Sequence, residues 1–330
     1  MNYITLYKQK RNKDLEDILK DVVPDELTYH NRYFSYDFNN GFRIKFNDLT
    51  INYKLIILDK ITRCVYYKDI IRPEKDTIYC YEKKYLINYE IIVLKSFNDN
   101  MYDSIPLKVI TYDIKNKDVL IILNPSLNKA NPPGLGDAIA WMTAIYKFKL
   151  KNPKTNVYVY LGYKEVEDIF KKKYNDEIIF ISEKDVKCKK FYATYLIGCF
   201  YNNDYYFMNE DYQNISLVEW GYTILGLPHD KEFKLDLSFD YKEDKPYVCI
   251  ATHASSINKE WLCKNGWYDL VKYLKNIGYN VYDIDAQDIN KSSLVSTEIP
   301  SNAINKTGYH ISLIERAKLI SGADFFIGLS

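Results

Sequence analysis

The sequence predicts an α/β protein in which two Rossmann-like domains follow a small antiparallel β domain. From about residue 116, apolar runs of strand length alternate with helical patterns, which is typical of a mostly parallel sheet. A polar stretch at 229–245 interrupts this alternation, which then restarts. Before residue 116 the runs alternate in polarity and are rich in tyrosine and β-branched residues. We therefore expect domains at 1–115, 116–240 and 241–330.

The N-terminal domain is predicted to be mainly β-sheet. A short helix is expected at 14–20, and β-branched runs predict strands at 49–58 and 85–94. Turn signals at 39–41 and 98–100 punctuate these runs. No catalytic constellation stands out here, so we expect this domain to bind a partner, such as another strand.

The first α/β domain is predicted from the apolar strand 118–123 and a helix at 138–148, whose apolar residues recur at helical spacing. The further elements expected are strands at 156–161 and 177–181, an apolar run at 191–198, and helices at 164–174 and 216–225. Gly226 and Pro228 follow the last helix as a C-terminal cap and a stop signal.

The second α/β domain repeats this alternation. Its expected elements are strands at 247–252, 279–285 and 325–327, and helices at 266–276 and 312–320. Ser312 and Glu315 have the spacing of a capping box. The sequence stops where another strand-to-helix turn is due, which leaves the sheet half covered. We therefore expect the natural protein to continue beyond residue 330.

The turn Pro132-Pro133-Gly134-Leu135-Gly136-Asp137 joins the first strand and helix of the first α/β domain. Open α/β sheets bind ligands at such turns, and glycines permit close approach of a ligand. The turn is neither a G-x-G-x-x-G fingerprint nor a Walker A loop. Asp137 is placed in the first turn of the helix, where it is either a helix N-cap or a carboxylate with a chemical role.

A second turn of the same kind, residues 252–261, opens the second α/β domain. Its hydroxyls, its backbone N–H groups and Lys259 suit a diphosphate. The alternative is an exposed lysine beside a packing tryptophan. We expect His253 to have a structural or hydrogen-bonding role rather than to be a base, and Trp261 and Trp267 to anchor the core.

Composition limits the function further. The formal net charge is +1, which does not suggest nucleic-acid binding. No apolar run reaches the length of a membrane helix, and no signal-peptide core is present, which predicts a cytoplasmic protein. The six cysteines form no C-x-x-C motif, so we expect buried, reduced thiols.

Taken together, these motifs resemble the ADP-heptose glycosyltransferases, and among them the bacterial autotransporter O-heptosyltransferases. Gly134-Leu135-Gly136-Asp137 with Ala140-Trp141 resembles their first-domain turn. The other matching segments are 191–195, 246–251, Lys259-Glu260-Trp261, Gly266-Trp267, Glu315-Arg316-Ala317 and 323–330. The resemblance covers residues from about 35 to 330, is weakest in the β domain, and implies a GT-B arrangement.

The resemblance implies an inverting transfer of heptose from ADP-heptose to Ser or Thr hydroxyls of an autotransporter adhesin passenger. The family's base falls on Asp137 and its donor-phosphate lysine on Lys259. The donor-binding positions that we expect are Gly134, Leu135, Gly136, Thr252, Ser255, Lys259, Gly328, Leu329 and Ser330. The N-terminal domain matches the family's acceptor-binding and assembly region, which makes a homo-oligomer an expectation. The family's four-cysteine iron site would lie beyond residue 330, so no cofactor is expected within this sequence.

Two other functions remain open. The first is a lipopolysaccharide-type heptosyltransferase with a sugar acceptor, although that class begins almost directly with the glycine turn. The second is a non-catalytic, strand-binding partner of an adhesin, against which the presence of Asp137 and Lys259 argues.

Overall fold

A computed structural model divides the chain into two compact units, Met1–Leu235 (unit 1) and Asp236–Ser330 (unit 2). The boundary between them falls inside the polar stretch 229–245 that the sequence predicted as a linker. The structure describes residues 2–5, 26–39, 41–81, 89–97, 104–123, 135–174, 176–197, 215–253, 261, 263, 265–285, 300–308 and 310–329.

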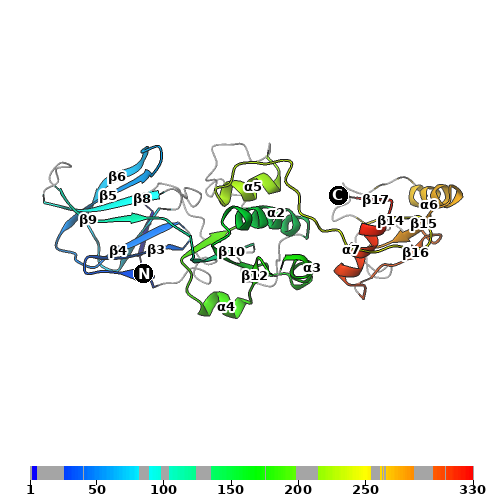
Figure 1. The fold of residues 1–330 in the computed structure, drawn as a ribbon, viewed down its shortest axis with the longest axis horizontal. Helices are drawn as coiled ribbons and strands as arrows, with labels where there is room; N and C mark the ends of the chain where they lie inside the picture. The colour runs from blue at the N-terminus through cyan, green and yellow to red at the C-terminus, as the bar shows by residue number, and fades with distance from the viewer. Residues whose placement is uncertain are drawn as a thin grey trace. The chain divides into compact units, whose positions relative to one another are not determined.

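The first part of unit 1 contains a four-stranded antiparallel sheet with the order β6-β5-β8-β9 (Figure 1). Its strands are β5 (Asn52–Asp59), β6 (Val65–Ile71), β8 (Tyr89–Ser96) and β9 (Ser104–Thr111). The central strand β5 buries Leu55 and Ile57, which are fully inaccessible to solvent. The strands expected at 49–58 and 85–94 are therefore present as β5 and β8. The helix expected at 14–20 and the turn expected at 98–100 lie outside the described residues.

A second sheet faces the first and continues into the α/β part of unit 1. Its order is β1-β7-β4-β3-β13-β10-β11-β12, with β2 paired to β3. Its N-terminal strands are β1 (Asn2–Thr5), β2 (Tyr29–His30), β3 (Phe34–Asn39), β4 (Phe42–Phe46) and β7 (Thr77–Tyr81). Phe46 of β4 stacks on Tyr53 of β5 with ring centroids 4.1 Å apart, so aromatic contacts join the two sheets.

The pairing of β3 with β13 crosses the boundary that the sequence predicted near residue 115. These strands are parallel, with Phe38 opposite Ala193 and Asn39 opposite Thr194. The Thr194 hydroxyl donates a hydrogen bond to Asn39 Oδ1 over 2.8 Å, and both side chains are buried. The β-rich part and the α/β part thus share one sheet, and a division into separate domains at residue 115 stays a prediction.

The α/β part of unit 1 has parallel strands between helices, as the sequence predicted. The strands are β10 (Asp118–Ile122), β11 (Asn156–Tyr160), β12 (Ile179–Phe180) and β13 (Ala193–Leu196), and the helices are α2 (Leu135–Lys151), α3 (Lys164–Tyr174), α4 (Glu183–Cys188) and α5 (Leu217–Ile224). Val186 of α4 packs in one core cluster with Leu196 of β13, whereas Phe148 of α2 contacts Tyr195. Neighbouring residues of a strand point to opposite faces, so α2 and α4 cover opposite faces of the sheet (Figure 1).

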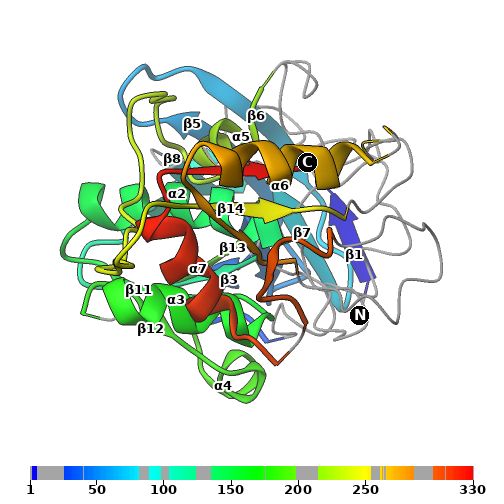
Figure 2. The same cartoon turned by 90° about the vertical axis from the view of Figure 1, so that its right-hand side faces the viewer.

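Unit 2 is a parallel sheet with the order β16-β15-β14-β17. Its elements are β14 (Tyr247–Ala251), α6 (Gly266–Asn276), β15 (Asn280–Asp283), β16 (Ile304–Asn305), α7 (Leu313–Gly322) and β17 (Phe325–Gly328). Val248 packs with Trp267 of α6, and Cys249 packs with Leu319 of α7. The two helices therefore cover opposite faces of β14 (Figure 2).

The chain around the boundary is fastened separately to each unit. Lys147 of α2 forms a 2.6 Å ion pair with Asp230. In unit 2 the Phe239 N–H donates to Ser321 Oγ over 2.7 Å, and this hydroxyl donates to the Phe239 carbonyl over 2.9 Å.

Two further sequence expectations concern the surface. No helix in the described part of the chain is long and apolar enough to span a membrane. The cysteines that the structure describes are free, but only Cys80 and Cys249 are buried, whereas Cys64, Cys188 and Cys263 are exposed. The expectation of buried thiols was therefore wrong for those three.

Candidate functional site

Asp137 lies in the first turn of α2, the helix that follows strand β10 in the chain. Because α2 begins at Leu135, Asp137 is the third residue of the helix, and the N-cap interpretation is wrong. Its side chain is partly buried, and no described residue forms a hydrogen bond or ion pair with its carboxylate. A carboxylate in a first helical turn is stabilised in its charged form by the helix dipole. No described side chain therefore competes for the lone pairs of Asp137.

The remainder of α2 holds this first turn in place. Ala138, Trp141 and Ile145 recur on its buried face, and each is almost inaccessible to solvent. On the other side of the turn, Leu135 is 37% exposed, and a Cβ built on Gly136 would meet no atom within 4 Å. The turn therefore has open space beside its backbone, as a ligand-binding turn requires. Gly134 lies outside the described residues.

The second candidate site is at the carboxyl edge of the sheet in unit 2. Thr252 follows β14 directly and is fully buried. β14 pairs with β17 in a register that places Ala251 opposite Gly328, so the ends of these strands are adjacent. Leu329 then packs into the core cluster that α6 covers. The structure thus brings Thr252, Gly328 and Leu329 to one edge, whereas Ser255, Lys259 and Ser330 lie outside the described residues.

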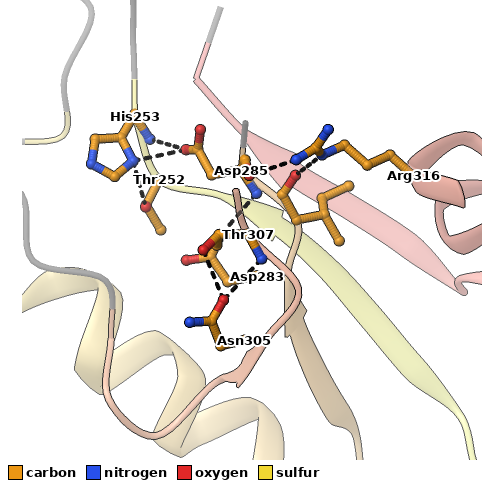
Figure 3. A network of polar contacts seen from close by, with 8 residues as sticks. Thr252, His253, Asp283, Asp285, Asn305, Thr307 and Arg316 are labelled. Atoms are coloured by element: carbon orange, nitrogen blue, oxygen red, sulfur yellow. Dashed lines mark hydrogen bonds and ion pairs between the residues drawn. The ribbon is translucent and has the colours of Figure 1, made fainter. Parts of the chain in front are cut away.

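A hydrogen-bonded network occupies the same edge (Figure 3). Asp285 Oδ2 accepts from the His253 backbone N–H over 2.7 Å and lies 2.9 Å from the ring Nδ1 of the same residue. Since a carboxylate only accepts, the proton of this second bond belongs to Nδ1. The hydrogen-bonding role expected for His253 is therefore present.

A second carboxylate, Asp283, lies beneath this pair. It is fully buried, and its Oδ1 accepts from the Asp285 backbone N–H over 3.2 Å. Burial raises the pKa of Asp283 to about 6, and the nearby Asp285 carboxylate adds to this rise. The Asp285 N–H, His253 and the Thr252 hydroxyl lower the pKa by less than burial raises it. Two carboxylates two residues apart thus have different environments.

Arg316 of α7 holds the chain that carries these acids. Its Nε donates to the Ile284 carbonyl over 2.9 Å and its Nη2 to the Asp285 carbonyl over 3.2 Å. Beside it, the N–H and hydroxyl of Thr307 donate to Asn305 Oδ1 over 2.8 and 2.7 Å. Both contacts are drawn in Figure 3. The guanidinium therefore fixes the path of the backbone where β15 ends.

The sequence analysis did not identify Asp283, Asp285 or Arg316 as parts of a site. The available signal was a pair of acids at the end of an apolar strand, in the position that follows the donor turn by one strand. One expectation in this region was wrong: Trp261 is 39% exposed, although its ring meets that of the buried Trp267 edge-on, with centroids 5.1 Å apart.

Comparisons with known proteins agree with these two sites. No protein-family model matches the sequence. The autotransporter heptosyltransferase Aah of Escherichia coli is 33% identical over 300 residues, which are 89% of this chain and 70% of Aah. The autotransporter heptosyltransferase TibC of Escherichia coli O78:H11 is 28% identical over 89% of this chain and 68% of TibC. BimC of Burkholderia thailandensis, described as an inactive autotransporter heptosyltransferase, is 25% identical over 46% of this chain and 36% of BimC.

The fold gives the same relationship. The crystal structure of TibC, an iron-containing dodecameric glycosyltransferase of enterotoxigenic Escherichia coli, superposes with a TM-score of 0.76 at 27% identity, covering 93% of this chain and 75% of TibC. TibC has also been crystallised with ADP-D-β-D-heptose. The protein is thus a glycosyltransferase of the GT-B fold class. More narrowly, the chain belongs to the autotransporter heptosyltransferase family.

Proposed function

We propose that this protein transfers heptose from ADP-heptose to Ser or Thr hydroxyls of an autotransporter adhesin passenger, in the cytoplasm. Membership of the family supports heptose transfer. The observation that carries the proposal to this chain is the Asp137 carboxylate, which lies in the first turn of α2 and has no partner among the described residues.

The proposed reaction needs one base and one stabilised leaving group. Asp137 takes the proton of the acceptor hydroxyl while the hydroxyl oxygen attacks the anomeric carbon of heptose. The bond from that carbon to the diphosphate oxygen breaks on the opposite face, so the configuration inverts and ADP leaves with the bonding electrons. Lys259 and backbone N–H groups stabilise the charge that develops on ADP.

We assign the donor to unit 2. The assignment is supported by the edge at which Thr252, Gly328 and Leu329 meet, because open α/β sheets bind their ligands beyond the carboxyl ends of the strands. The other donor-binding residues of this proposal are Gly134, Leu135, Gly136, Ser255, Lys259 and Ser330.

TibC is described as iron-containing and dodecameric. No three His, Cys, Asp or Glu side chains converge on one point in the part of this chain that the structure describes. The described residues therefore do not fit an iron site, and no step of the reaction is derived through iron. We propose a homo-oligomer for this protein, by analogy with the TibC assembly.

The test is the intact mass of an autotransporter passenger co-expressed with the protein and supplied with ADP-heptose. We expect mass additions in heptose steps that disappear with Asp137→Asn, because the amide cannot accept the proton. Asp168→Asn removes a carboxylate on helix α3 of the same unit and should leave transfer unchanged. Transfer by Asp137→Asn would refute the assignment of the base.

The same assay separates the alternative functions. Modification of core oligosaccharide instead of the passenger would support a lipopolysaccharide-type enzyme. Passenger binding without any mass addition would support a non-catalytic partner, the behaviour that the description of BimC as inactive makes relevant.

A further inference from the structure

His253 is the second residue after strand β14, and Asp285 is the second residue after the neighbouring strand β15. The two strands are parallel with Ile250 opposite Asp283, so both residues leave the sheet at the same edge. The Ile284 N–H donates to the Ile250 carbonyl over 3.0 Å, which extends the pairing beyond the strand ends. His253 and Asp285 are therefore neighbours because of the register of the sheet.

One carboxylate oxygen fixes His253 twice. Asp285 Oδ2 accepts from the backbone N–H over 2.7 Å and from the ring Nδ1–H over 2.9 Å. The side chain of His253 is 7% exposed and that of Asp285 is 9% exposed. A backbone bond alone would set the position of the chain, and the additional ring bond sets its direction. Figure 3 shows both bonds converging on the same oxygen.

Asp285 is itself held on three sides. Its N–H donates to Asp283 Oδ1, and its carbonyl accepts from Arg316 Nη2 and from the Gly308 N–H over 3.1 Å. Side chains from β15 and α7 and backbone from the segment before α7 thus fix the residue that fixes His253. Such an orienting partner commonly decides how well the residue it holds performs its function.

We propose that Asp285 is a positioning residue for the donor nucleotide, acting through His253. The two hydrogen bonds set the direction in which the chain leaves β14, between the buried Thr252 and the remainder of the proposed donor turn. The inference rests on the proposed function, because it requires that unit 2 binds the ADP part of the donor. Neither Asp285 nor His253 acts as the base or contacts the transferred sugar in this scheme.

The experiment measures ADP affinity by isothermal titration calorimetry with the full chain. Asp285→Ala removes the acceptor of both bonds and should weaken ADP binding about tenfold or more, the effect typical of losing an orienting partner. His253→Leu removes the ring bond and should also weaken binding. His253→Asn places an amide N–H where Nδ1 stands, so it should keep an affinity close to that of the wild type.

In transfer assays, Asp285→Ala and His253→Leu should raise the KM for the donor with little change in kcat, because the reacting groups remain in place. The matched control is His30→Asn, since His30 also bonds through Nδ1, to Ser35 Oγ over 2.8 Å, but in unit 1. Circular dichroism and calorimetry show whether each variant is folded. If Asp285→Ala does not fold, the comparison of His253→Leu with His253→Asn carries the test.

Three outcomes overturn the inference. If His253→Asn binds ADP as weakly as His253→Leu, the ring contacts the ligand directly and positioning by Asp285 is not its role. If folded variants all bind ADP like the wild type, the pair has no part in donor binding. If the wild type binds no ADP, the assignment of the donor to unit 2 fails and the inference fails with it.

Discussion

At the scale of single residues, Asp283 is a charge that the fold disfavours. Burial raises the pKa of its carboxyl from 3.8 to about 6. The raised pKa means that folding favours the protonated form, so the stabilising contribution is complete below the unfolded pKa. It is lost as pH rises through about 6, where the carboxyl ionises inside the fold. The free energy involved is on the order of 2–3 kcal/mol.

Asp283→Asn should therefore stabilise unit 2 at pH 8 relative to the wild type, and should do so much less at pH 4. The amide oxygen still accepts the Asp285 N–H, while the buried charge is gone. Calorimetric unfolding at the two pH values measures the difference. The control Asp324→Asn removes an exposed carboxylate of the same unit and should show no such pH dependence. An equal effect of Asp283→Asn at both pH values would contradict the raised pKa.

The same residues show how far a sequence predicts a site. Asp137 could be placed in the first turn of a helix after a strand, because a glycine turn between an apolar run and a helical pattern is a local signal. The contact of His253 with Asp285 could not, because it depends on the register of two strands 32 residues apart in the chain. The sequence expected only a hydrogen-bonding role for His253, without a partner.

At the scale of elements, helices α2 and α5 meet so closely that only glycine fits at one position. A Cβ built on Gly221 would lie 2.7 Å from the Cβ of Ala144 and 3.5 Å from a ring carbon of Trp141. The methyl group of Ala144 cannot rotate away, so the helices themselves would have to separate. Trp141 belongs to the buried face that holds Asp137 in place.

Gly221→Ala should therefore destabilise unit 1 by about 1–3 kcal/mol, the range for overpacking in a core. Ala144→Gly alone should cost about 1 kcal/mol through helix propensity. The double variant should be more stable than the sum of the two effects predicts, because removing one methyl group makes room for the other. Denaturant unfolding of the four proteins checks this double-mutant cycle, and strict additivity would argue against the close contact.

The accuracy of the predicted elements follows the range of the signals. Helices with an apolar period and a cap were predicted well: α6 has the expected ends, and Ser312 and Glu315 form the capping box expected before α7. Helix α4 was not predicted, since its six residues are too few to show a period. The strands of the β-rich part could be recognised as strands, but their pairing could not, because it is decided by contacts far apart in the sequence.

At the scale of the whole molecule, the β-rich part belongs to the same folding unit as the first α/β part. Besides the pairing of β3 with β13, the hydroxyls of Tyr112 and Tyr195 are hydrogen-bonded to each other in a fully buried position. The Phe38 ring lies 4.9 Å from that of Tyr112 and 5.3 Å from that of Tyr192. Strand β13 thus depends on residues before 115 for both its neighbour and its aromatic packing.

A chain that begins at residue 116 should consequently fail to fold cooperatively through residue 235. It would lack β3 and Tyr112, leaving the edge of β13 and the Tyr195 hydroxyl without their partners. In the full chain, Thr194→Val should destabilise unit 1 by about 1–3 kcal/mol, since the buried Asn39 carbonyl loses its donor. Calorimetry of both proteins makes the comparison. A sharp unfolding transition in the shortened chain would instead establish an independent α/β domain beginning near residue 116, and the shared sheet would then be a docking contact between two domains.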